Sequence, residues 1–152
     1  MAHQWWGHQV AGAAVEGSSF LTKSMAHYFS TVLLERQYGP DQVRRVRHYD
    51  LDRYLQGRSR EAVQEEPLLR SQLQPYIHYE KGAFVLYSLR SYLGEKALHG
   101  ALAQFLVDYK GRGASYSVAD DLYAYLRRAR LAALPTTCST TISGASRSTT
   151  TR

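Results

Sequence analysis

Apolar side chains recur at helical spacing, between glycine and proline interruptions, along most of this chain of 152 residues. The spacing predicts helices over residues 18–38, 40–56, 79–93 and 95–109, and a fifth helix that begins at Ser117. No segment alternates apolar and polar residues in the way a half-buried strand does. The chain is therefore predicted to be mainly α, with about five helices around one modest core.

Local signals predict where several of these helices begin and end. Pro40 suits the first turn of the second helix. Gly57 and Gly94 are predicted to end the second and third helices, since glycine is common just after a helix. Ser117, followed three residues later by Asp120, resembles a capping box and is predicted to open the fifth helix.

The end of the chain differs in composition from the rest. Its last 17 residues contain seven threonines and four serines but only one large aliphatic residue, Ile142. Such a segment buries too little apolar surface to offset the entropy of ordering it. We therefore predict a helical domain over residues 1–131 and a Ser/Thr-rich disordered tail over 132–152. A natural linker-like tail and an out-of-frame extension both fit this composition.

Composition also argues against several classes of protein. The single cysteine, Cys138, cannot form an internal disulfide, which excludes a disulfide-stabilised mini-domain and a cysteine-rich zinc module. No run of about 18 apolar residues and no signal peptide is present, so the chain as it stands is expected to be cytoplasmic. The net charge of +6 permits an acidic partner. Nucleic-acid binding is not expected, because no recognition motif accompanies the arginines. The arginines considered were Arg44, Arg45, Arg47, Arg53, Arg58, Arg60, Arg127, Arg128 and Arg130.

Two motifs in the chain are similar to motifs of a known family. Residues 1–7, MAHQWWG, resemble the end of the zinc-binding motif H-E-x-x-H-Q-W-W-G, and residues 79–82, YEKG, resemble a Tyr-x-Lys-Gly motif. Residues 21–28 resemble the helix that follows the zinc motif. Over residues 1–131 the chain resembles the aminopeptidase N family of gluzincin zinc metallopeptidases. The similarity is greatest to a bacterial subgroup in which this domain follows a multi-pass membrane region.

The resemblance implies the helical half of a thermolysin-like catalytic domain that uses Zn²⁺ to hydrolyse the N-terminal bond of a peptide substrate. In the family, two histidines four residues apart and a glutamate on the next helix hold the zinc, and a second glutamate is the general base. His3 matches the second histidine, whereas the first histidine and the base would precede Met1. Lys23 aligns with the ligand glutamate, and a charged lysine offers no lone pair to zinc. We expect this chain alone neither to hydrolyse peptides nor to bind zinc tightly.

Tyr79 matches the family's tyrosine that donates its hydroxyl to the oxyanion of the tetrahedral intermediate. By the residues alone, Tyr79 also suits a purely packing role at the start of a helix. His27, one turn after Lys23, is a further candidate ligand beside His3. His8 and His78 are expected to be surface or hydrogen-bonded residues rather than zinc ligands.

Two other classes of function stay open at this stage. One is a non-catalytic helical interaction module, such as a pseudoenzyme remnant, and the other is a basic nucleic-acid binder. The resemblance implies that a second lobe covers one face of the helices, so the isolated chain is expected to self-associate through that face. The residues expected near it are Trp5, Trp6, Val10, Phe20 and Leu21, and the two tryptophans are also expected to belong to the core.

Overall fold

The structure, a computed structural model, describes residues 2–10, 13–111 and 117–133 of the chain. The predicted disordered tail begins two residues too early, since residues 132 and 133 are helical, and the rest of it, from residue 134 onward, lies outside the described residues. The prediction of a mainly α fold is confirmed. The elements in chain order are the 3₁₀ turn η1 (Ala2–Gln4), the π-helical segment η2 (Phe20–Ser24), α1 (Met25–Tyr38), α2 (Pro40–Arg60), the π-helical segment η3 (Ile77–Lys81), α3 (Gly82–Leu93), α4 (Glu95–Tyr109) and α5 (Ala119–Ala133).

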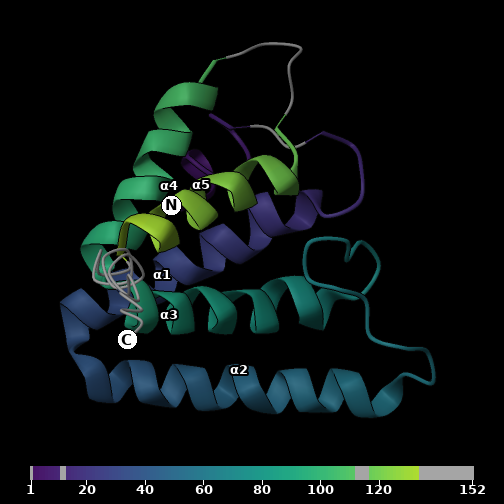
Figure 1. Cartoon of the computed structure of the whole chain (residues 1–152). Helices are drawn as coiled ribbons and strands as arrows, with labels where there is room; N and C mark the ends of the chain where they lie inside the picture. The colour runs from purple at the N-terminus through teal and green to yellow at the C-terminus, as the bar shows by residue number, and fades with distance from the viewer. Residues whose placement is uncertain (1, 11–12, 112–116, 134–152) are drawn as a thin grey trace, which may run out of the picture.

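Helices α1, α2 and α3 lie side by side, with α2 along one edge, and α4 stands across their ends (Figure 1). Helix α5 packs against α4. None of the helices in the described residues combines the length and apolar character needed to cross a membrane.

The core forms where the apolar faces of these helices meet. Phe20 and Leu21 enter it from the segment before α1, and the helical period of the sequence directs the other members inward. Burying such side chains is worth about 1.5–3 kcal/mol each before the cost of ordering the chain. The larger fully buried members are Trp6, Tyr28, Phe105, Leu21, Met25, Leu86, Leu98, Leu102 and Leu122.

The predicted end of the second helix is wrong. Helix α2 continues through Gly57 to Arg60. A Cβ atom at position 57 would lie 2.7 Å from the ring of Tyr76. Gly57 therefore lets the Tyr76 ring pack closely against α2. A glycine does not by itself end a helix when the helix is held by such a contact.

The predicted cap of the fifth helix is also wrong in detail. The carboxylate that accepts a backbone hydrogen bond there belongs to Asp121, which accepts from the Val118 N–H at 2.9 Å. Asp120 instead accepts from Arg70 at 3.2 Å, in an exposed ion pair with the loop before η3. Arg70, distant in sequence, thus binds the Asp120 carboxylate that the capping-box pattern had assigned to the helix start.

The N-terminal segment folds back onto the helices, and this overturns the expected exposed face. Trp6 is 2 % exposed and stacks on Phe29 and Phe105, whereas Trp5 is 49 % exposed. The prediction of a core position is thus confirmed for Trp6 and wrong for Trp5. Val10, Phe20 and Leu21 are buried with Trp6 in the same cluster, so they do not form an open contact face.

Candidate functional site

Two π-helical segments lie against each other at the start of α1 and α3. The Ser24 hydroxyl in η2 donates a hydrogen bond to the backbone carbonyl of His78 in η3, at 2.5 Å. At Gly82 a Cβ atom would overlap the side chain of Ser24, so only glycine permits this approach. π-Helical turns inside α-helices are frequent at functional sites. Both predicted helices were expected to be regular here, and both contain an extra residue in one turn instead.

This contact brings Lys23 and Tyr79 together. The Lys23 ammonium nitrogen lies 5.5 Å from the centre of the Tyr79 ring, a cation–π arrangement. Tyr79 belongs to η3, and its side chain is 36 % exposed to solvent. Lys23 and Tyr79, 56 residues apart in the sequence, are therefore neighbours in the fold.

His3 lies beside the same segment. Gly7 adopts φ +111°, a left-handed conformation that favours glycine, and its Cα position faces both Thr22 and the His3 ring. The His3 Nδ1 atom is 3.3 Å from the Trp6 carbonyl. Because a carbonyl only accepts, Nδ1 is the donor in this contact, and in the neutral form of the ring Nε2 then carries the lone pair. Metal-ligating histidines are commonly oriented by this kind of bond.

His78 contradicts the expectation of a surface or hydrogen-bonded histidine. It is 1 % exposed, and neither ring nitrogen has a hydrogen-bond partner among the described residues. Burial, assisted by the nearby Lys23 charge, lowers the pKa of His78 to about 4. The ring is therefore neutral at pH 7, which keeps a second positive charge away from Lys23. Its sequence neighbour Tyr79 contacts it, with ring centres 5.3 Å apart.

His27 points to α2 and forms a charge network there. Its Nε2 atom is 2.9 Å from a carboxylate oxygen of the buried Asp50, and this hydrogen bond raises the pKa of His27. The neighbouring Glu80, also buried, accepts from Arg53 at 3.0 Å. The sequence analysis did not identify this network. The sequence offered one weak signal for this network, namely that Asp50 falls among the apolar positions of the second helix.

A zinc ion does not fit the side chains described here. No group of three or more His, Cys, Asp and Glu side chains in the described residues is arranged to hold a metal ion. His3 offers one nitrogen, His27 is bonded to Asp50, and Lys23 places an ammonium beside Tyr79. Catalytic zinc sites use three protein ligands, so this donor set is too small.

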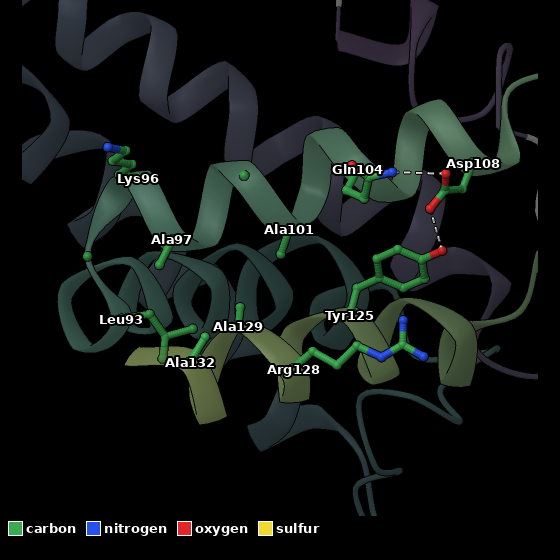
Figure 2. Close-up of a pocket in the computed structure, with 12 residues that line it drawn as sticks. Leu93, Lys96, Ala97, Ala101, Gln104, Asp108, Tyr125, Arg128, Ala129 and Ala132 are labelled. Carbon is green, nitrogen blue, oxygen red and sulfur yellow. Dashed lines mark hydrogen bonds between the residues drawn. The ribbon is translucent and has the colours of Figure 1, made fainter. Parts of the chain in front are cut away.

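A large hollow lies elsewhere, between α4 and α5. It has a volume of about 1010 Å³, and small side chains such as Ala97, Ala101 and Ala129 line it (Figure 2). At one end Asp108 accepts hydrogen bonds from Tyr125, at 2.7 Å, and from Gln104, at 3.0 Å. The elements that carry His3, Lys23 and Tyr79 do not line this hollow. The hollow is therefore separate from the site that the motifs predicted.

Residues 1–137 match the family model described as the peptidase family M1 domain, and the chain therefore belongs to peptidase family M1. Members of this family are in general zinc-dependent peptidases that act on peptide substrates. Neither a curated protein nor a solved structure matches the chain significantly.

Proposed function

We propose that this chain is the helical part of an aminopeptidase-type M1 domain, of the aminopeptidase N kind, and that it does not hydrolyse peptides by itself. Tyr79 is in position to donate its hydroxyl to an oxyanion that forms on a peptide carbonyl. His3 supplies one metal-binding nitrogen. Lys23 occupies the position at which the family has a ligand glutamate, so that zinc ligand is missing from this chain.

The observation that carries this proposal is the ammonium group of Lys23 over the ring of Tyr79, at 5.5 Å. An ammonium has three donors and no acceptor, and it repels a divalent cation over such distances. The neighbouring His78 is held neutral by burial and by this same charge. The local electrostatics thus oppose a cation, while the tyrosine keeps the exposure that its role requires.

Zinc binding by three variants tests the role of Lys23. Lys23→Glu adds a ligand and removes the positive charge, whereas Lys23→Gln removes the charge only. We expect Lys23→Glu to bind zinc at least about tenfold more tightly than the original chain, measured by calorimetry, and Lys23→Gln to gain much less. His3→Ala in the Lys23→Glu chain should abolish the gain. Equal affinity of Lys23→Glu and Lys23→Gln would show that position 23 does not face a metal site.

A peptidase assay tests the absence of activity. With zinc and an aminoacyl-naphthylamide substrate, release of the naphthylamine should not exceed that of the same protein with a chelator. The donor set described above lacks the three ligands that a catalytic zinc needs. Chelator-sensitive turnover that disappears in Tyr79→Phe would refute the proposed inactivity while supporting the role of Tyr79.

A further inference from the structure

Two arginines contact the ring of Tyr87, and only one of them has a carboxylate. Arg90 and Arg47 each hold the guanidinium carbon 4.2 Å from the ring centre. Arg90 pairs with Glu35 at 2.5 Å and with Glu95 at 3.6 Å. Arg47 forms no ion pair with any described residue, and its Nε atom is buried without a hydrogen-bond partner. Buried donors of a charged group normally have partners, so Arg47 is incompletely satisfied. Because its Nε atom is closed to solvent, an external acceptor reaches Arg47 only where the side chain lines the hollow described next.

A hollow between α2 and α3 opens beside this guanidinium. Its volume is about 210 Å³, and its lining combines positive and apolar side chains. The residues that line it are Arg44, Arg47, His48, Leu51 and Phe84. No carboxylate is among them.

The nearest acidic residues are engaged elsewhere. Asp41 forms an exposed pair with Arg44 at 3.5 Å. Asp50 borders a small cavity beside Arg47, but its carboxylate is bonded to His27. Arg47 therefore has no ion-pair partner among the described residues.

The arrangement of Arg47 is rigid enough to select a ligand. Its guanidinium carbon is 5.1 Å from the centre of Phe84 as well as 4.2 Å from that of Tyr87, so two rings restrict its rotamers. A planar guanidinium held in this way presents a fork of N–H donors that matches a carboxylate or a phosphate. Leu51 and Phe84 form an apolar wall next to it.

We propose that this hollow binds a small ligand that carries an oxyanion, a carboxylate or a phosphate, next to an apolar group. The oxyanion pairs with Arg47 and approaches Arg44 and His48, and the apolar group packs on Leu51 and Phe84. The site uses α2 and α3 rather than the segments that hold Lys23 and Tyr79, so it is independent of the proposed function.

Titration of the full chain by nuclear magnetic resonance tests the site with defined probes. The probes are inorganic phosphate, acetate and phenylacetate, each at an ionic strength held constant with sodium chloride. We expect the backbone amide signals of Leu51 and Phe84, which line the hollow in the original chain and in the variants, to shift and saturate at about millimolar phosphate or phenylacetate. A few charge-assisted hydrogen bonds supply such affinity. Phenylacetate binding more tightly than acetate would identify a carboxylate ligand with an apolar group, and saturation by phosphate alone a phosphate ligand. The absence of saturation with all three probes would overturn the proposal.

Three substitutions make the result specific. Arg47→Met should weaken binding by about tenfold or more, whereas Arg45→Met, on the same helix but not lining the hollow, should change it less than about twofold. Arg47→Lys keeps the charge without the fork and should also weaken binding about tenfold, with the fold checked by circular dichroism. If Arg47→Met does not fold, Arg47→Lys decides the matter. Unchanged affinity in Arg47→Lys, or an equal loss in Arg45→Met, would overturn the proposal.

Discussion

The helix pair α4–α5 and the π-helical pair η2–η3 show two different relations between sequence and structure. Helix α4 spans Glu95–Tyr109, the residues that its apolar spacing predicts, and its inward side chains are all large and apolar. Segments η2 and η3 depart from the period on which the prediction of two regular helices depended. The candidate site lies in these two irregular segments, with Lys23 in η2 and Tyr79 in η3. Regular helices therefore supply the core here, and irregular turns position the chemistry.

A core substitution in α4 should have the largest effect on stability. Phe105 is fully buried and stacks on Trp6 and Tyr109, so Phe105→Ala should lower the free energy of unfolding by about 3–5 kcal/mol. Val107→Ala, at a position 71 % exposed on the same helix, should change it by less than about 0.5 kcal/mol. Urea unfolding followed by circular dichroism measures both. Similar losses in the two variants would mean that α4 does not anchor the core.

Much of α4 could be predicted because its apolar residues face one side of a regular helix and Gly94 ends the helix before it. Gly94 has φ +83°, as expected of a glycine just after a helix. Gly57 misled the prediction because its role is contact with Tyr76, a residue distant in sequence. Local patterns do not encode such contacts, and the same limit hid the Asp120–Arg70 pair.

The π-helical pair should show the next largest effect, through pH. The unfolded chain protonates His78 near the ordinary pKa of 6.5, and the folded chain does so only near 4. The unfolded state therefore binds more protons between these values, and stability present above pH 6.5 is lost as the pH falls through about 4. The difference corresponds to about 3 kcal/mol.

Comparison with His78→Phe isolates this contribution. Phenylalanine does not titrate, and neither ring nitrogen of His78 has a partner among the described residues that the substitution would leave unpaired. Between pH 7 and pH 4 the original chain should lose about 3 kcal/mol more stability than the variant, measured by urea unfolding at each pH. Parallel pH curves for the two proteins would show that His78 does not titrate as its burial implies.

A matched glycine pair tests the close contact between the π-helical segments. Gly82→Ala places a methyl group against Ser24, so we expect a loss of about 1–3 kcal/mol from overpacking. Gly100→Ala, in α4, meets nothing within 4 Å and should stabilise the helix by about 0.5–1 kcal/mol. Thermal unfolding of the two variants distinguishes the regions, and a neutral Gly82→Ala would show that η2 and η3 separate easily.

The sequence named candidate site residues, but their environment could be predicted only in part. The MAHQWWG and YEKG motifs pointed to His3 and Tyr79, and Lys23 followed by alignment with the helix between them. What the motifs could not give was the burial of His78 and Asp50, because burial depends on which helix faces lie together. In sequence the two residues look like solvent-exposed polar residues. Only the packing of η3 against η2 and α2, and of α2 against α1, buries them.

The smallest expected effect comes from the outer edge of the same region, where His27 meets Asp50. The hydrogen bond to Asp50 raises the pKa of His27, with help from Glu80, so the folded chain holds the proton to a higher pH than the unfolded chain. This stabilisation is complete below the unfolded pKa and is lost as the pH rises through the folded one, which is opposite in sign to the effect of His78. His27→Gln keeps a donor for Asp50 but cannot titrate. The original chain should therefore gain stability over this variant as the pH falls through the raised folded pKa towards 6.5, and keep that advantage below it. The gain should be smaller than the His78 effect, because His27 is partly exposed and solvent screens its charge. Urea unfolding from pH 8 to pH 5 measures the difference, with the exposed His8→Gln as the control, and an advantage that grows with rising pH would contradict the assigned role of Asp50.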